Sequence, residues 1–317
     1  MAGVESRDAW PLLSYATLGP TAETLQLWTQ IIGKVRLART PWINHSWHVT
    51  LQVSARGLAT ALIPNGASAF QLELDLIDHQ LVVRTTDGEE RRVALAGQTV
   101  GGFYAGAMEA LESVGAATSI FAEPNELADP VPFADDHAAR IYDPAVARDF
   151  WRALVQIERV FGRFRSCFIG KSSPIHFFWG AADLALTRFS GRRAPLHPGG
   201  VPHLPDAVTQ EAYSHEVSSA GFWPGDPRLP EPSFYSYAYP TPAGFADWPV
   251  RPAGARFEPA LGEFVLPYEA VRAADDPDAA LLAFLQSTYD AAAELAHWDR
   301  PALERREGQC GRPPIVG

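Results

Sequence analysis

The chain is poor in cysteine, has no excess of positive charge and contains no long apolar run. Its two cysteines, Cys167 and Cys310, cannot build a disulfide framework, which fits a reducing compartment. The 37 Asp and Glu outnumber the 26 Lys and Arg, and a formal net charge of −11 argues against nucleic-acid binding through phosphate attraction. No segment reaches the ~18 apolar residues of a membrane span, and the N-terminus MAGVESRDAW lacks the pattern of a secretory signal. The sequence therefore predicts a cytoplasmic protein with no nucleic-acid or membrane partner.

Several motifs of well-known catalytic sites are also missing. The chain has no Gly-x-Ser-x-Gly nucleophile elbow, no Walker-type phosphate loop and no dinucleotide-binding glycine motif. Two histidines four residues apart, as on a metalloprotease helix, do not occur. These absences argue against nucleophilic catalysis and against nucleotide cofactors bound in the usual folds. No particular cofactor or metal is indicated by what remains.

The most informative stretch is residues 171–195, KSSPIHFFWGAADLALTRFSGRRAP. Two apolar, alternating runs flank a small-residue bend, which predicts a buried β-hairpin. The hairpin contains five polar or aromatic side chains of kinds that serve in binding or catalysis: His176, Trp179, Asp183, Arg188 and Arg192. Buried polar groups need partners, so these side chains form either an internal hydrogen-bonded network or the wall of a pocket.

The order of predicted elements repeats along the chain. Each half reads as helix, about five strands and helix, and the landmarks Trp28 and His48 have counterparts in Trp151 and His176, at offsets of 123 and 128 residues. We therefore predict an α+β protein of internally duplicated helix, antiparallel sheet and helix modules, related by a pseudo-two-fold axis. The predicted divisions are a first module at 1–122, a linker at 123–143, a second module at 144–305 and a tail at 306–317.

Apolar periodicity locates the individual elements. The predicted helices span 21–36, 100–111, 146–161 and 281–295, and the main predicted strands span 47–53, 58–63, 70–76, 81–84, 93–95, 175–179, 184–189 and 263–266. Three Pro/Gly-rich insertions, at 195–205, 223–232 and 240–259, interrupt the second module. Loops of this length usually cover a site or form ordered surface segments.

Histidines near acidic residues are the candidates for acid–base catalysis. His176 shares the hairpin with Asp183, and His215 precedes Glu216 on another candidate strand, where successive side chains point to opposite faces. A single His or carboxyl group with an adjusted pKa in a cleft suffices for general acid or base catalysis. If the two histidines met across strands with a carboxylate, they would instead form a zinc or iron set. Two core histidines with hydrogen-bonded rings are the simplest alternative.

Cations and aromatic side chains are the candidates for substrate binding. Basic residues follow the first helix of each half and also the hairpin. If the two halves face each other, these residues would surround an anionic ligand. The alternative is that they form surface ion pairs with the many acidic residues. Tyrosines at alternate positions of FYSYAYP, 234–240, share one strand face, which lines either a ligand cavity or a core. The predicted binding residues are Lys34, His48, Lys171, Trp179, Arg188, Arg192, Trp223, Tyr235 and Tyr237.

Several long motifs carry a resemblance to a known family. WTQIIGKVRLA at 28–38, NHSWHVTLQVSARGLAT at 44–60, FIGKSSPIHFFWGAADLALTRFSGR at 168–192 and YSHEVSSAGFWPG at 213–225 are the most specific. Through them the chain resembles a bacterial family of uncharacterised proteins, catalogued as a domain of unknown function. The resemblance implies no activity, cofactor or catalytic residue. Gln26 stands where that family often has His in a TLHxW-like stretch, which lowers the prospect of a metal or acid–base group there.

Two main functional hypotheses follow. In the first, a small-molecule enzyme uses a His and carboxylate pair in a pocket between the halves, with Arg188 and Lys171 or Lys34 holding an anionic substrate. In the second, the duplicated modules clasp a small molecule without changing it, as a sensor or carrier. A structural or interaction role is the third hypothesis, and it would require a filled cleft and an exposed apolar patch elsewhere. Fold class alone does not choose between these.

Overall fold

The structure describes residues 9–312 in a computed structural model. Residues 1–8 of the predicted first module and 313–317 of the predicted tail lie outside the described residues. The described helices are α2 Tyr15–Arg39, α3 Val100–Ser113, α4 Pro144–Ser166, α5 Asp206–Ala212, α6 Tyr268–Arg272, α7 Pro277–Leu295 and α8 Arg300–Leu303, with 3₁₀ turns η1 Asn44–Ser46, η2 Phe133–Asp135 and η3 Phe245–Asp247. Among residues 9–312, no helix combines the length and apolar character that a membrane crossing requires.

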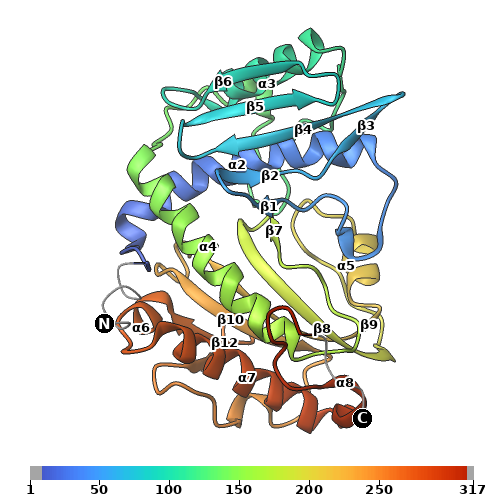
Figure 1. Ribbon diagram of the computed structural model, residues 1–317, viewed down its shortest axis with the longest axis vertical. Coiled ribbons are helices and arrows are strands. Elements are labelled where there is room, and N and C mark those ends of the chain that lie inside the picture. The colour runs from blue at the N-terminus through green and yellow to red at the C-terminus, as the bar shows by residue number, and fades with distance from the viewer. Residues whose placement is uncertain (1–8, 313–317) are drawn as a thin grey trace.

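The strands form two antiparallel sheets, which lie one above the other in Figure 1. Sheet 1 has the order β1-β2-β4-β5-β6, with β3 also paired to β4, and sheet 2 has the order β11-β12-β10-β9-β8-β7. The predicted α+β class is confirmed by this mixture of helices and antiparallel sheets. The strands are β1 Gln52–Val53, β2 Gly57–Ala59, β3 Ile63–Asn65, β4 Ser68–Asp75, β5 Gln80–Thr85, β6 Glu90–Ala94, β7 His176–Phe178, β8 Asp183–Arg193, β9 His215–Trp223, β10 Ser233–Tyr239, β11 Arg256–Glu258 and β12 Glu263–Pro267.

The two hairpins that the sequence predicts are both present. In sheet 1, Arg84 pairs with Glu90 across a turn in which Gly88 takes a φ of 89°, a conformation that glycine adopts without a side-chain clash. In sheet 2, His176 pairs with Ala185 across the bend at 179–182. Alternation of apolar residues thus located both strand pairs correctly, because each pair buries one face.

Other boundaries differ from the predictions. Helix α2 begins at Tyr15 rather than at residue 21, because buried side chains such as Leu18 continue its apolar face toward the N-terminus. The predicted strand at 47–53 shrinks to β1, since the preceding η1 turn has His45 at a φ of 59° and cannot continue an extended ladder. The third predicted insertion contains structure of its own, because η3 and β11 lie within it, and the first insertion leads directly into α5.

The sheets meet edge to edge at an antiparallel bridge between Leu51 and Phe177, next to β1 and within β7. The Leu51 amide donates to the Phe177 carbonyl at 2.9 Å, and the Phe177 amide donates to the Leu51 carbonyl at 2.8 Å. Helix α4 runs diagonally across this junction in Figure 1 and contacts strands of both sheets. Asp143 caps α4 by accepting from the amides of Ala145 and Val146, and Pro144 opens its first turn, where a missing N–H costs nothing.

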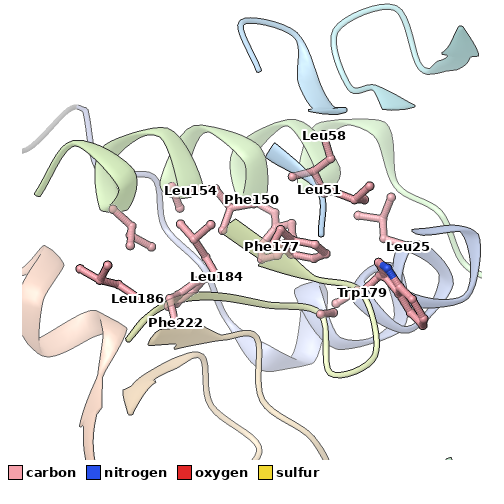
Figure 2. Close-up of a cluster of buried hydrophobic side chains, with 14 of the residues drawn as sticks. Leu25, Leu51, Leu58, Phe150, Leu154, Phe177, Trp179, Leu184, Leu186 and Phe222 are labelled. Atoms are coloured by element: carbon pink, nitrogen blue, oxygen red, sulfur yellow. The ribbon is translucent and has the colours of Figure 1, made fainter. Parts of the chain in front are cut away.

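The main core fills the space beneath α4 at this junction. Figure 2 shows side chains of α4, of both sheets and of α2 pointing toward one another there. Phe150 of α4 and Phe222 of β9 pack with their ring centroids 6.3 Å apart. The labelled members are Leu25, Leu51, Leu58, Phe150, Leu154, Phe177, Trp179, Leu184, Leu186 and Phe222. On this side the junction between the halves is a packed core, so the predicted pocket between them does not lie here.

Candidate functional site

Sheet 2 has one face covered by helices, and a row of tyrosines lies on the opposite face. Phe222 and Phe234 point toward α4 and α6, where Phe234 stacks against Tyr268 with centroids 6.2 Å apart. The alternate residues of β10, Tyr235, Tyr237 and Tyr239, point the other way and are only half-buried. The predicted tyrosine ladder is therefore confirmed as one face of a strand. It faces loops rather than the apolar core, which leaves it in contact with solvent.

A cluster of carboxyl and phenol groups forms on this face, and we call it the acid–tyrosine cluster. The hydroxyl of Tyr235 donates a hydrogen bond to Oδ2 of Asp183, and the hydroxyl of Tyr237 pairs with that of Tyr213 at 2.9 Å. The rings of Tyr235 and Tyr237 lie nearly parallel, at 14° with centroids 6.2 Å apart. The cluster consists of Glu126, Asp183, Tyr213, Tyr235, Tyr237 and Glu263.

Two glycines make room for the cluster. Gly221 of β9 lies opposite Tyr235, and a Cβ atom there would lie 2.3 Å from the tyrosine oxygen. A Cβ atom on Gly180 would lie 1.8 Å from a carboxylate oxygen of Glu126. The absence of a side chain at each position lets a phenol and a carboxylate lie directly against the backbone.

Loops that project over the sheet bring in the remaining members. The amide of Glu126 donates to the carbonyl of Pro202 at 3.1 Å, so the segment around 126 and the loop at 195–205 hold each other in place. Tyr213 follows α5, and its ring stacks on His197 with centroids 4.6 Å apart. The expected role of the 195–205 insertion as a cover over a site fits this placement.

The carboxyl groups of the cluster have raised pKa values. Desolvation raises the pKa of Asp183 to about 6, against the opposing effect of the Tyr235 hydrogen bond. Desolvation and the charge of Asp183 raise the pKa of Glu126 and of Glu263 to about 7. No hydrogen-bond donor contacts the carboxylates of Glu126 or Glu263 among the described residues. Asp183 is 8% exposed, Glu263 is half-buried and Glu126 is exposed, so exposure to solvent increases from Asp183 to Glu126.

This arrangement suits proton transfer near neutral pH. A carboxyl group that changes its protonation state close to pH 6 or 7 acts as a general acid in one state and as a general base in the other. Desolvation also raises the pKa of Tyr235 and Tyr237 well above the ordinary value, so both phenols stay protonated, and the Tyr235 hydroxyl donates to Asp183. The three carboxyl groups accept few hydrogen bonds from the protein. This favours a ligand whose own N–H or O–H groups donate to them.

His176 does not belong to this cluster. Its side chain is 1% exposed, packs edge-on against Phe178 at 4.6 Å between centroids, and has no partner for either ring nitrogen among the described residues. Desolvation lowers its pKa to about 3. His176 is therefore a core histidine rather than a catalytic one, and its ring nitrogens lack the hydrogen bonds that were predicted for a core position.

The alternative in which His176 and His215 meet across strands is not realised in the structure. His176 pairs with Ala185, which lies opposite Gly221, whereas His215 pairs with Arg193 at the far end of β9. Six residues of β9 separate the two levels, or about 20 Å of extended strand. The two-histidine metal set is therefore not formed. Within residues 9–312, no three His, Cys, Asp or Glu side chains lie close enough to hold a metal ion.

Glu216 and Arg192 form an ion pair away from the cluster. Oε2 of Glu216 lies 2.7 Å from Nη2 of Arg192 and accepts from the Ser190 hydroxyl at 2.8 Å. Arg192 also donates to the carbonyl of Ala296 beyond α7 at 2.6 Å. His215, whose Nδ1 lies 3.1 Å from the Ser214 hydroxyl, is not its partner. The prediction that His215 and Glu216 lie on a strand and point to opposite faces is thus confirmed, and the two do not form a catalytic pair with each other.

Arg188 points into the helix-covered side of sheet 2, so its predicted place beside Asp183 is wrong. Its guanidinium carbon lies 3.4 Å from the ring centroid of Phe164 and 4.4 Å from that of Tyr289, and Nη2 donates to the Phe164 carbonyl. Burial lowers the pKa of Arg188 to about 10. Strand alternation explains the placement, because 183 and 188 differ by an odd number of residues.

The other predicted binding residues lie in separate places. Lys34 bonds to the side chain of Asn125, and burial lowers its pKa to about 8. Trp179 donates to the carbonyl of Val49 at 2.9 Å. His48 is 2% exposed and accepts from the Ile43 amide at 3.2 Å.

Lys171 and Trp223 are the last two of the predicted set. The ammonium group of Lys171 lies 5.4 Å from the ring centroid of Trp47 and 5.0 Å from that of Phe189. Trp223 is half-buried at the end of β9 and shares the cluster's face by strand alternation with Gly221. Of the predicted residues, the structure therefore brings together Asp183, Tyr235 and Tyr237, with Trp223 on the same face.

Sequence reasoning missed Glu126, Tyr213 and Glu263 as site residues. Glu263 had a detectable signal, because an acidic residue opens a strand that is otherwise apolar, EFVLP. Glu126 had none, since it lies in an acidic, proline-rich segment that reads as a linker. Its φ of 62° and its contact with Gly180 arise only from the folded chain.

Comparison with known proteins gives one match. No curated protein matches the chain. No solved structure matches it either. The model of a family of unknown function, DUF5996, matches residues 10–305. With nearly its whole length covered, the chain belongs to this family of unknown function.

Proposed function

We propose that the protein is an enzyme that carries out acid–base chemistry on a small neutral or positively charged organic molecule at the acid–tyrosine cluster. The observation that carries this proposal is a set of three neighbouring carboxyl groups, buried Asp183, half-buried Glu263 and exposed Glu126, with pKa values raised to about 6 or 7. Perturbed carboxyl groups of this kind are characteristic of sites that transfer protons.

Each group has a separate role in the proposal. Asp183 is the proton donor or acceptor, and the Tyr235 hydroxyl fixes the direction of its carboxylate. Glu126 and Glu263 bind donor groups of the substrate, since no donor of the described protein occupies them. The nearly parallel rings of Tyr235 and Tyr237 offer aromatic surface to an apolar or cationic part of the ligand.

The charge of the cluster argues against the anionic substrate that the sequence suggested for this site. Arg188 lies behind the sheet, Lys171 lies over Trp47, and Lys34 bonds to Asn125. An anion beside Asp183 would meet three carboxyl groups, and like charges at short distance repel. A protonated amine or guanidinium would be attracted by the same groups.

A paired screen of ligands tests the proposal. Purified protein is incubated with alkylamines, polyamines, guanidines and amino sugars, and in parallel with carboxylates and phosphates, between pH 5 and 9. Thermal unfolding reports binding, and mass spectrometry reports conversion. We expect cationic compounds to raise the unfolding temperature of the wild type and of Asp247→Asn, an exposed control, and to have less effect on Asp183→Asn.

The outcomes separate the two main hypotheses. Conversion that needs Asp183 supports the enzyme. Stabilisation that needs Asp183 without conversion of any stabilising compound supports the non-catalytic binding protein instead. If cationic compounds stabilise Asp183→Asn as much as the wild type, the cluster is not the binding site.

We also propose that the halves arose by duplication, with modules at 1–122 and 144–305 around a linker at 123–143. Both halves contain a long helix, an antiparallel meander and a closing helix. The 128-residue offset from His48 to His176 also relates Val49 to Phe177 and Leu51 to Trp179.

Contacts at the junction agree with that offset. Leu51 bridges to Phe177, and Val49 accepts from the Trp179 indole at 2.9 Å, so each residue meets the other's counterpart, as a two-fold axis requires. Superposition of the halves in an experimental structure tests the idea. If residues 44–60 do not superpose on 172–188 together with their flanking helices, the duplication is rejected.

A further inference from the structure

A second chemically distinct surface lies at the C-terminal end of α4. There the chain forms an open groove with a volume of about 440 Å³ between the last turns of α4, the segment at 168–175 and Arg305. We call it the basic groove. Its lining residues are Gly162, Arg165, Ser166, Phe168, Gly170, Lys171, Ser172, Ile175 and Arg305.

The lining of the basic groove contains three cations and no acidic residue. In a chain with a net charge of −11, most arginines of the described region pair with carboxylates, as Arg163 does with Glu307 at 2.8 Å. Arg165 and Arg305 have no carboxylate within ion-pair distance among the described residues. Their charges are therefore compensated only by solvent, which leaves a local positive potential on an acidic protein.

Both arginines are held by the same kind of contact. Nε of Arg165 donates to the carbonyl of Ser173 at 2.8 Å, and Nε of Arg305 donates to the carbonyl of Ser166 at 2.7 Å. A guanidinium fixed through Nε keeps its two terminal nitrogens as a planar pair of donors. No protein acceptor within residues 9–312 bonds to those terminal nitrogens in either arginine. The groove thus has two oriented guanidinium groups whose terminal donors are unused.

The remaining lining residues limit the class of ligand. Lys171 and Ser172 also line the groove, and the ammonium group of Lys171 lies over the rings of Trp47 and Phe189 rather than beside the arginines. Phe168 and Ile175 give the groove an apolar wall, which suits an organic portion of a ligand. A volume of a few hundred Å³ is the size of a small-molecule site and is too small for a folded partner.

We propose that the basic groove binds a small molecule that carries a phosphate group or a pair of carboxylates. The terminal guanidinium nitrogens of Arg165 and Arg305 donate to its oxygens, because planar guanidinium groups match the geometry of oxyanions. The site is separate from the acid–tyrosine cluster, since it lies at the end of α4 on the helix-covered side of sheet 2. An anionic ligand here and a cationic substrate at the cluster are compatible.

Isothermal titration with pyrophosphate and with citrate, at 20–50 mM salt, tests the proposal on the full chain. We expect saturable binding to the wild type, with at least a tenfold loss of affinity in the Arg165→Gln, Arg305→Gln double variant. Arg228→Gln is the matched control, because Arg228 is an exposed arginine paired with Asp226 at 2.7 Å. The double variant Arg165→Lys, Arg305→Lys keeps the charge and loses the planar donors, so its affinity should fall between the two.

Circular dichroism and thermal unfolding establish that each variant is folded, and the lysine variant provides a folded comparison if glutamine disturbs the C-terminal segment. The proposal is overturned if the wild type shows no saturable binding of either probe. It is equally overturned if the double glutamine variant binds as tightly as Arg228→Gln. If the lysine variant binds like the wild type, charge alone attracts the anion and the oriented guanidinium geometry is rejected.

Discussion

The phenol of Tyr235 reaches across a strand to bond to the carboxylate of Asp183. Tyr235 lies on β10 and Asp183 on β8, with β9 between them. Gly221 is the β9 residue opposite Tyr235, and a Cβ atom there would lie 2.3 Å from the tyrosine oxygen. A contact between non-neighbouring strands thus depends on a missing side chain in the strand between them.

Gly221→Ala should break this contact. The new methyl group must displace the Tyr235 ring, and overpacking of this kind costs about 1 to 3 kcal/mol. Because the Tyr235 hydrogen bond lowers the pKa of Asp183, its loss should move that pKa above about 6. Carboxyl ¹³C chemical shifts followed against pH measure the change. Gly254→Ala is the control, since a Cβ atom there meets only ordinary contacts at 3.4 Å or more. An unchanged Asp183 titration in Gly221→Ala would contradict the prediction.

Asp183→Asn should become more stable, relative to the wild type, as pH rises. The folded state raises the pKa of Asp183 from 3.8 to about 6. Below pH 3.8 the carboxyl group of Asp183 is protonated in both the folded and the unfolded state, so its burial adds no cost of desolvating a charge. Above about pH 6 the folded wild type carries a desolvated negative charge. The pH-dependent difference should reach about 3 kcal/mol at most. Urea unfolding at pH 4, 6 and 8 measures it, and a difference that does not vary with pH would refute it.

His176→Phe should protect the protein against acid. The folded state lowers the pKa of His176 from 6.5 to about 3, so above pH 6.5 neither state is protonated. As pH falls below 6.5, the unfolded chain binds a proton that the folded chain rejects, which costs about 3 kcal/mol by pH 4.5. The His176→Phe variant should not lose this stability at low pH, whereas the control His137→Gln, at an exposed position, should lose as much as the wild type. Equal losses of stability between pH 7 and 4.5 in His176→Phe and the wild type would contradict the assignment.

Arg188→Ala should destabilise the protein more than Arg188→Met does. The arginine fills the space beside Phe164 and Tyr289 and donates to the Phe164 carbonyl in the last turn of α4. Alanine leaves a void and removes one of the two hydrogen bonds that the Phe164 carbonyl accepts, the other coming from the Cys167 amide, which together cost about 3 to 5 kcal/mol. Methionine refills most of the volume and removes a buried charge that has no carboxylate partner. Chemical unfolding at pH 7 ranks the two variants, and the reverse order would contradict the idea that filling this space stabilises the fold.

Strand alternation predicts which residues of one strand share a face, but not which residues of different strands meet at the site. It identified Tyr235 and Tyr237 as neighbours on one face, because that relationship depends only on the period of two within one strand. The same rule, applied to residues 183 and 188, would have placed Arg188 on the opposite face from Asp183. The His176 and His215 hypothesis failed for a different reason. It required the register between β7 and β9, which depends on the position of β8 and is not encoded in either strand.

The sequence by itself determined the local elements and the chemical character of the chain. Apolar periodicity defined the hairpins and the cores of the main helices, because each depends on residues a few positions apart. Only the tertiary structure decided which polar groups meet. Glu126, Asp183 and Glu263 come from three distant segments, and their pKa values rise because folding desolvates them together. Desolvation and charge repulsion depend on distances in space, which no spacing along the chain fixes.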